Sequence, residues 1–413
     1  MPNSRAPSDS SRSGSPAPAA LRRSTDLKRI LLAAVFFLVL QEIVVRAVFP
    51  LPEALGFDRA GYSQMGFTPG AETPSSLAHL SFRWASDPDG FAFVHALNLY
   101  GFRDREWTLE TPAGASRVAF VGDSFVEGFS APAEDTIPAV FAVLAGDSVD
   151  VLNLGLGGGD LPAYARLLRD AVPLFRPDDV ILVIFANDVL PTRFDPAWLT
   201  AALEPERPSA WAPRLQYVVR RLAAGRWVPR RWTEPPFEFL PSVPDPRNPW
   251  SDGRRAGRLE AFVAPDVARA IRAGRFNPVL VDYLPWFGRH LRRPFEIEDH
   301  LVALRDFLEE RNAFLWVVYV PTKNQVSDRY LETQARFSPP ESVISLMGPE
   351  FQVQAALLGE TCRALGVAFL DLTPALRKAE AEAGPLYWSY DDHMRSAGYR
   401  EVAKLVYAWW STP

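Results

Sequence analysis

Cysteine is almost absent from this chain of 413 residues, which contains only Cys362. A single cysteine excludes a disulfide within the chain and any zinc site built from several cysteines. Histidine is also scarce, and because the five histidines lie far apart in the sequence we expect no metal site and no metal cofactor. The chain has no excess of positive charge either: its formal net charge is -5, which argues against a nucleic-acid partner.

The first fifty residues carry two successive signals. Residues 1–28 are dominated by Ser, Pro, Ala and Arg, so they cannot bury enough apolar surface to fold and are predicted to form a disordered cytoplasmic tail. Residues 29–50 contain the apolar run ILLAAVFFLVL and are predicted to form a transmembrane signal-anchor. Basic residues precede this run, so the positive-inside rule predicts a single-pass inner-membrane protein with its main domain in the periplasm.

Charged residues near the end of the apolar run leave alternatives open. Glu42 and Arg46 interrupt it, which is also compatible with a buried or interfacial helix of a soluble protein. A cleaved signal peptide is a further alternative, although no A-x-A-like cleavage site follows the run.

The remaining sequence, which is rich in apolar residues, alternates short apolar runs with segments of helical periodicity. The runs predict five buried strands at residues 118–121, 149–154, 180–185, 314–320 and 367–370. Strands that alternate with helices form a parallel sheet covered on both faces. We therefore predict an α/β domain over residues 113–413, preceded by a connecting region at 51–112 and interrupted by a proline-rich insertion at about 191–297.

A candidate nucleophile follows the first predicted strand. The tripeptide Gly122-Asp123-Ser124 places the Ser124 hydroxyl at the carboxyl end of a parallel strand, where ligands of such sheets bind. The N–H groups at the start of the next helix can stabilise an oxyanion there. The same tripeptide recurs at residues 146–148, but it precedes a strand there, and we interpret that copy as an ordinary turn.

A serine nucleophile requires a general base, and the base requires a carboxylate that orients it. His393 lies in the segment YDDHMRSAGY between the last strand and the final helix, at the same edge of the sheet as Ser124. His300 also follows an acidic residue, but it begins a helix that leads into the fourth strand, which places it at the opposite edge. His393 is therefore the predicted base.

Two further segments end strands at the edge of the sheet that carries Ser124. In NLGLGGGD the backbone N–H of Gly158 is a candidate oxyanion donor, and in FANDV the side-chain amide of Asn187 is another. With the N–H of Ser124 they form the predicted oxyanion hole. Taken singly, the two segments are better explained as a helix-entry turn and a capping pair.

Together these four segments resemble the SGNH hydrolase superfamily from about residue 98 to the C-terminus. The resemblance implies a three-layer α/β/α fold with a five-stranded parallel sheet of the flavodoxin-like type. It also implies Ser124 as nucleophile, Gly158 and Asn187 as oxyanion donors, and His393 as base. The lead-in NLYGFRD is similar to one in membrane-anchored bacterial members of the family.

Two positions depart from the family pattern. Phe185 occupies the glycine position of Gly-x-Asn-Asp, which leaves the backbone shape there open. Tyr390 occupies the aspartate position of Asp-x-x-His, so Asp391 takes the Asp-x-His spacing seen in exopolysaccharide O-acetylation enzymes. We predict that Asp391 orients His393, with Asp392 as the alternative, because an immediate neighbour in an extended segment points away.

The resemblance implies acyl transfer through an acyl-serine intermediate. Transfer to water makes the protein an esterase and transfer to a sugar hydroxyl makes it an O-acetyltransferase, and the sequence leaves both open. The predicted periplasmic location favours O-acetylated cell-envelope or exported glycan as substrate. It is also compatible with a membrane partner that donates acyl groups. The alternatives are a non-catalytic glycan-binding or assembly protein that keeps the fold, and a soluble lipase or thioesterase.

The segment VVYVPTKNQV, which contains Lys323, is similar to one in acetylation-related proteins. A purely structural role explains this segment equally well.

Overall fold

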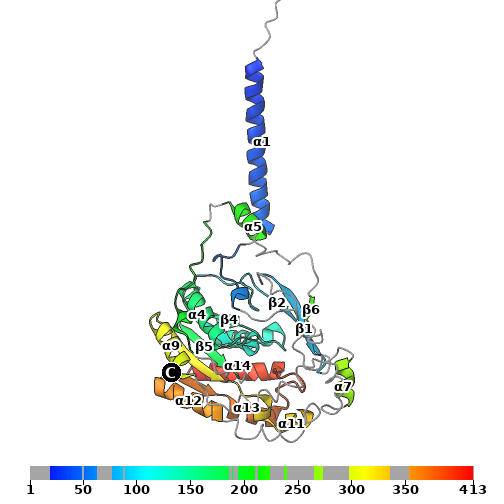
Figure 1. The fold of residues 1–413 in the computed structure, drawn as a ribbon, viewed down its shortest axis with the longest axis vertical. Helices are drawn as coiled ribbons and strands as arrows, with labels where there is room; N and C mark the ends of the chain where they lie inside the picture. The colour runs from blue at the N-terminus through cyan, green and yellow to red at the C-terminus, as the bar shows by residue number, and fades with distance from the viewer. Residues whose placement is uncertain are drawn as a thin grey trace, which may run out of the picture. The chain divides into compact units, whose positions relative to one another are not determined.

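The computed structural model describes residues 19–48, 51–62, 77–86, 89–185, 188, 194–209, 213–223, 237–239, 265–272, 297–334 and 353–412. The chain divides into two compact units. The first contains residues 1–50 and 211–220, and the second contains residues 51–210 and 221–413. The elements of both units are labelled in Figure 1.

The first unit is built on the helix α1 (Ala19–Val48). Its stretch Asp26–Val48 is long and apolar enough to cross a membrane. The helix begins at Ala19 rather than at residue 29, so residues 19–28, which we predicted as part of a disordered tail, are helical. Ala, Leu, Arg and Lys make up most of this stretch, and their high helix propensity lets them extend a helix that the apolar run nucleates.

One of the charges that interrupt the apolar run has a structural role within the first unit. The Glu42 carboxylate accepts hydrogen bonds from the backbone N–H groups of Arg214 (2.8 Å) and Leu215 (3.2 Å). These residues begin the helix α5 (Arg214–Ala223), so Glu42 satisfies N–H groups that have no partner inside that helix. Glu42 also accepts a hydrogen bond from Arg46, 2.7 Å away.

The second unit is built around a five-stranded parallel sheet with the strand order β4-β3-β5-β7-β8. The strands are β3 (Ser116–Gly122), β4 (Val149–Gly155), β5 (Asp179–Ile184), β7 (Phe314–Tyr319) and β8 (Ala368–Asp371). This order, with the first strand of the sheet inside it, is that of flavodoxin-like folds. The predicted fold class is confirmed, and each strand lies on one of the five predicted runs.

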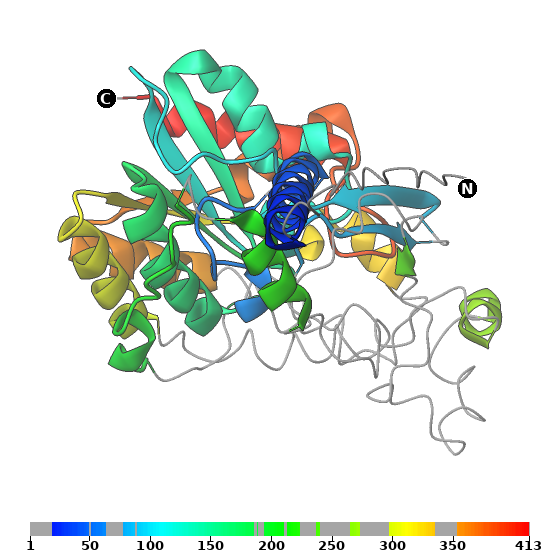
Figure 2. The same cartoon turned by 90° about the horizontal axis from the view of Figure 1, so that it is seen from above.

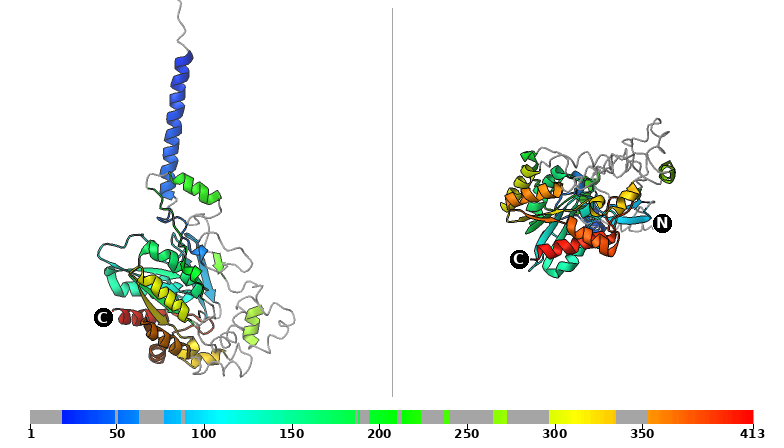
Figure 3. Two further views of the ribbon diagram at one scale, coloured as in Figure 1. Left: turned by 60° about the vertical axis from the view of Figure 1, so that its left-hand side comes forward. Right: turned by 90° about the horizontal axis from the view of Figure 1, so that it is seen from below.

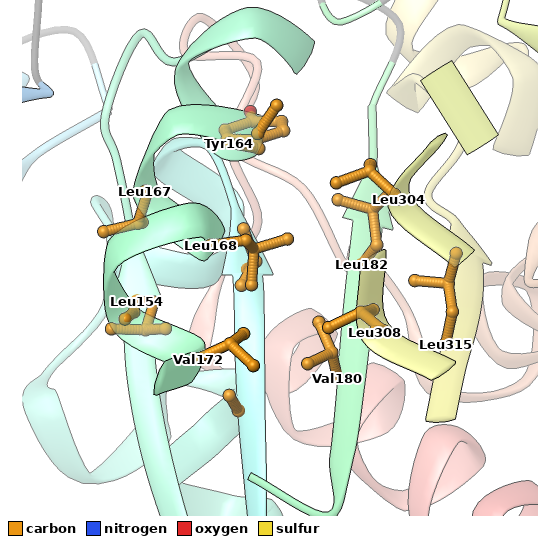
Figure 4. Packing of buried hydrophobic residues seen from close by; sticks show 14 of the residues in the cluster. Leu154, Tyr164, Leu167, Leu168, Val172, Val180, Leu182, Leu304, Leu308 and Leu315 are labelled. Atoms are coloured by element: carbon orange, nitrogen blue, oxygen red, sulfur yellow. The ribbon is translucent and has the colours of Figure 1, made fainter. Parts of the chain in front are cut away.

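Helices cover both faces of this sheet, as its buried strands require (Figure 2). Successive side chains of β5 point to opposite faces, so Leu182 joins one hydrophobic core and Val183 joins the other. The first core is completed by α4 (Leu161–Phe175), α9 (Glu298–Glu309) and α12 (Val353–Leu365), and the second by α3 (Ile137–Ala145), α13 (Thr373–Ala383) and α14 (Ser396–Trp410). Figure 4 shows side chains of α4 and α9 packed against β4, β5 and β7 in the first core.

The connecting region contributes a second, smaller sheet. The strands β1 (Ser81–Ser86) and β2 (Phe91–Ala96) form an antiparallel hairpin, which can be followed in Figure 3. The strand β6 (Phe237–Phe239) from the insertion pairs parallel to β1. Short helices occupy the connections: η1 (Arg59–Gly61), α2 (Ser124–Glu127), η2 (Ala133–Asp135), η3 (Gly146–Ser148), η5 (Pro196–Leu199), α7 (Pro265–Arg272), α10 (Lys323–Val326) and α11 (Arg329–Gln334).

A buried arginine in β3 ties the connecting region to the sheet. The Nε of Arg117 donates a hydrogen bond to the Asp150 carboxylate at 2.6 Å. Its two Nη atoms donate to the carbonyl oxygens of Thr108, Leu109, Glu110 and Phe175. The guanidinium thus uses all of its N–H donors, which is what makes a buried cation tolerable.

Candidate active site

The turn after β3 presents the candidate nucleophile. A Cβ at Gly122 would lie 2.8 Å from the carbonyl oxygen of Val183, so only glycine fits where the strand leaves the sheet. The Asp123 side chain then caps α2 by accepting a hydrogen bond from the N–H of Phe125 at 2.8 Å. Ser124 is the first residue of this helix and is largely buried.

The structure brings the three residues predicted as nucleophile, base and orienting carboxylate together. The Ser124 Oγ lies 2.6 Å from His393 Nε2, and His393 Nδ1 lies 2.5 Å from Asp391 Oδ1. Both distances are those of hydrogen bonds, in the order that a Ser-His-Asp triad requires. Asp392, the alternative orienter, instead forms an ion pair with Lys323 at 2.9 Å. Asp391 is therefore the carboxylate that contacts the imidazole.

The charges around the imidazole favour its protonation. Burial lowers the pKa of His393, but the Asp391 carboxylate, through its charge and its hydrogen bond, outweighs this effect, with help from Asp123 and Asp392. The net result is a pKa above the usual value of 6.5. Burial raises the pKa of Asp391, but the charge and hydrogen bonds of His393, together with the Lys323 ammonium, bring it below its ordinary value. The pair is thus suited to take up a proton on the imidazole.

Aromatic rings enclose the imidazole of the base. The ring of Phe129 stacks on His393 with a centroid distance of 5.6 Å and an angle of 20°, and the Phe125 ring lies 5.2 Å away. Phe185 packs against Phe125 at 4.1 Å, which gives the residue that departs from the family pattern a place in the core. Sequence reasoning missed the two phenylalanines beside the base, although both belong to the SFVEGF segment that begins with the serine.

The loop after β4 carries the predicted donor Gly158, whose φ of 69° is one that glycine adopts without strain. Its neighbour Gly157 donates its N–H to the Glu127 carboxylate at 3.0 Å. Because Glu127 is the last residue of α2, this bond ties the loop to the helix of the nucleophile. Asn187, the other predicted donor, lies outside the described residues. The neighbouring Asp188 is buried and accepts the N–H of Phe185 at 2.8 Å.

Glu127 is a functional candidate that sequence reasoning missed. Its fully buried carboxylate forms a two-pronged ion pair with the equally buried Arg59 of the connecting region, with one of the two hydrogen bonds at 3.1 Å. His95 of β2 lies 3.4 Å away. Burial raises the pKa of Glu127, but the charge of Arg59 and the contacts with His95 lower it on balance to about 2. A buried ion pair with a histidine beside it gives no periodic signal in a sequence, which explains why it was missed.

His300 and the second Gly-Asp-Ser tripeptide, which we did not assign to the site, lie elsewhere in the fold. His300 is buried in α9 beside the ring of Trp198, at 5.6 Å. The second Gly-Asp-Ser tripeptide forms η3 before β4, where Ser148 donates a hydrogen bond to the carbonyl oxygen of Ala145. Within the described part of the chain, no group of three or more His, Cys, Asp or Glu side chains is placed to hold a metal ion.

A flavodoxin-like sheet with a serine, a histidine and an aspartate in hydrogen-bond contact at the carboxyl ends of its strands defines a class: serine-dependent acyl hydrolases and acyltransferases. Residues 293–410 match the model of the SGNH hydrolase-like domain of the acetyltransferase AlgX. This C-terminal part of the chain is therefore similar to an SGNH hydrolase-like domain. These findings support an acyl hydrolase or acyltransferase activity.

Solved structures similar to this chain include a carbohydrate acetylesterase family member from Sinorhizobium meliloti, with 12% identity and a TM-score of 0.34 over 71% of this chain and 96% of the other. Others are the acetylxylan esterase Axe2 from Geobacillus stearothermophilus, with 10% identity and a TM-score of 0.34 over 73% and 98%, and an extracellular lipase from Streptomyces rimosus, with 10% identity and a TM-score of 0.35 over 71% and 100%. No curated protein matches the sequence.

Proposed function

We propose that this protein is a serine-dependent O-acyl hydrolase or O-acyltransferase that forms an acyl-serine intermediate. One observation carries the proposal: His393 lies between the Ser124 hydroxyl, at 2.6 Å, and the Asp391 carboxylate, at 2.5 Å. A serine hydroxyl is a weak nucleophile by itself, and this arrangement is the one that activates it.

In the first half of the reaction, the Ser124 oxygen attacks the carbonyl carbon of the ester while His393 Nε2 takes the hydroxyl proton. The negative charge that develops on the carbonyl oxygen is stabilised by the N–H groups of Ser124 and Gly158 and by the Asn187 amide. The carbonyl re-forms as the C–O bond to the alcohol breaks, and His393 returns its proton to the departing alcohol oxygen. Asp391 keeps its charge throughout and stabilises the imidazolium.

In the second half, a new hydroxyl attacks the acyl-serine. His393 accepts its proton, the acyl group leaves the Ser124 oxygen, and the proton goes back to that oxygen. If water supplies the hydroxyl, the products are a carboxylic acid and free enzyme. If a sugar supplies it, the product is a new ester on a glycan.

The proposed substrate is an acylated, chiefly O-acetylated, glycan of the cell envelope or of an exported polysaccharide. Two observations support it: the matching family model describes an acetyltransferase, and α1 is long and apolar enough to hold the domain at a membrane. The basic residues before the apolar run favour a periplasmic location of the domain. A transferase would also need an acyl donor, for which a membrane protein beside the anchor is the proposed partner.

The test compares the full-length protein in detergent with two variants, Ser124→Ala and His393→Ala, in the hydrolysis of p-nitrophenyl acetate. Each variant is expected to lose about 10³-fold or more in kcat. Ser148→Ala is the matched control, because it removes the serine of the second Gly-Asp-Ser tripeptide and should change nothing. Equal rates for Ser124→Ala and the wild type would refute the proposal and favour the alternative, a glycan-binding protein without catalytic activity.

Hydrolysis and transfer are separated by a second measurement on the same samples. An acetylated donor is supplied with and without a glycan oligosaccharide, and mass spectrometry follows both free acetate and acetylated oligosaccharide. Acetate alone identifies an esterase, whereas a Ser124-dependent gain of acetyl groups on the oligosaccharide identifies a transferase.

A further inference from the structure

The loop that carries both the base and its carboxylate, residues 389–393, is neither helix nor strand. A buried lysine holds it from one side. The Nζ of Lys323 donates hydrogen bonds to the carbonyl oxygens of Ser389 (3.1 Å) and Asp391 (3.2 Å). It also forms the ion pair with the Asp392 carboxylate at 2.9 Å. An ammonium group has three N–H donors, and the loop provides a partner for each.

An aspartate from the smaller sheet holds the same loop through its N–H groups. Asp89 lies in the turn between β1 and β2. Its carboxylate accepts the backbone N–H of Tyr390 at 3.0 Å and that of Asp391 at 2.7 Å. The loop therefore lies between an acceptor and a donor of opposite charge, and neither of them is close to it in the sequence.

Lys323 is held in place by its own surroundings. It begins α10 directly after β7, and a capping box fixes the start of that helix, with the N–H of Thr322 donating to Gln325 Oε1 at 2.8 Å. The side chain of Lys323 is only 2% exposed. Removing an ammonium from water is costly, and a buried ion pair returns little net stability, so stability alone does not account for this lysine.

We infer that Lys323 and Asp89 are positioning residues that fix loop 389–393 so that His393, already paired with Asp391, meets Ser124. The inference rests on the proposed function, and it adds residues that no triad motif contains. It also gives the hairpin β1–β2 a role at the site, because Asp89 belongs to its turn.

Because the two residues have opposite charges, their replacement should shift the pKa of His393 in opposite directions. A purely structural role would not produce such opposite shifts. The charged groups that act on the imidazole directly are Asp123 at the nucleophile turn and Asp391 and Asp392 on the loop. Lys323 acts on Asp391, and Asp89 faces both Asp391 and Lys323. Removal of the ammonium favours the imidazolium, and removal of the Asp89 carboxylate disfavours it. The acid limb of kcat/KM should therefore move to higher pH in Lys323→Met and to lower pH in Asp89→Asn.

The experiment measures kcat, KM and the pH profile of ester hydrolysis for the full-length wild type and the two variants. We expect kcat to fall by about 10²-fold in Lys323→Met with little change in KM, because displacement of a catalytic group by about 1 Å costs this much. Lys404→Met is the matched control: Lys404 is exposed on α14, forms an ion pair with the neighbouring Glu401 at 3.4 Å, and should behave as wild type. Thermal melting confirms that each variant is folded.

Three outcomes would overturn the inference: an unchanged kcat in Lys323→Met, a lower kcat with an unshifted acid limb, or shifts of the same sign in both variants. If Lys323→Met does not fold, the shift in Asp89→Asn alone decides. An NMR titration of the histidine rings, assigned with His393→Ala, measures the pKa of His393 without turnover. A protein without Ser124-dependent activity would refute the proposed function, and this titration would still test the positioning roles of Lys323 and Asp89.

Discussion

Replacement of Asp391 by asparagine tests the central contact of the site. Asp391 Oδ1 accepts two hydrogen bonds, from His393 Nδ1 at 2.5 Å and from the His393 backbone N–H at 2.8 Å. An asparagine whose oxygen takes the place of Oδ1 can accept both of these hydrogen bonds, but it carries no negative charge. The imidazolium that forms when His393 takes up the Ser124 proton then lacks the carboxylate charge that stabilises it.

Without this charge, His393 Nε2 is a weaker base for the Ser124 hydroxyl, 2.6 Å away. The aspartate-to-asparagine change in a Ser-His-Asp triad lowers kcat by about 10⁴-fold, which corresponds to about 5.5 kcal/mol of transition-state stabilisation. Substrate binding does not depend on this charge, so KM should change little.

The assay is steady-state hydrolysis of p-nitrophenyl acetate, with Asp392→Asn as the matched variant. Asp392 contacts Lys323 rather than the imidazole, so its replacement should cost far less than that of Asp391. If Asp392→Asn lost as much activity as Asp391→Asn, or if Asp391→Asn kept more than about a tenth of wild-type kcat, the assignment of the orienting carboxylate would be wrong.

Three further predictions concern pH and stability. Because the pKa of His393 lies above 6.5, kcat/KM should rise with pH and reach half its maximum above pH 6.5 in a profile measured from pH 5 to 9. Arg117→Met should lower the free energy of unfolding in urea by about 3 kcal/mol or more, because it leaves the Asp150 carboxylate without its most deeply buried partner. Burial raises the pKa of Glu127, but the ion pair with Arg59 and the contacts with His95 lower it to about 2, so the cluster contributes about 3 kcal/mol above pH 4.5. That contribution should be lost as the pH falls toward 2, and urea unfolding of Glu127→Gln should lack this part of the acid dependence.

The fold could be predicted from the sequence because the sheet is buried on both faces. Buried parallel strands are continuous apolar runs, and each of the five runs became a strand. The smaller sheet could not be predicted in the same way. Its strand β6 (Phe237–Phe239) is too short to show a period and lies in a proline-rich insertion. Its partner β1 is distant in the sequence, and the pairing depends on tertiary structure.

Some residues of the candidate site could be predicted from local sequence patterns, and others could not. Ser124 could be proposed because it stands in a motif at the end of a strand, and His393 because it stands in a motif before the final helix. The argument that adjacent side chains point apart favoured Asp391 over Asp392, and Asp391 is the one that contacts the imidazole. Glu127 was not singled out, and Lys323 was noted only within a family-like segment of open role, because charged side chains are usually exposed and nothing local marks the few that are buried. Only the fold shows which distant partners they meet.

The Asp-x-His spacing explains why this loop needs distant supports. Because Asp391 accepts both the backbone N–H and the ring N–H of His393, it forms an Asx-turn that joins carboxylate and base into one unit. The orientation of that unit toward Ser124 is then set by the loop as a whole and not by two independently anchored elements. Asp89 and Lys323 are charged contacts from outside the loop that hold it, in addition to the rings of Phe125 and Phe129 against His393. Loss of either should therefore turn base and carboxylate together: the contact with Ser124 weakens, while the hydrogen bond within the pair persists and keeps its low-field imidazole proton in the NMR spectrum.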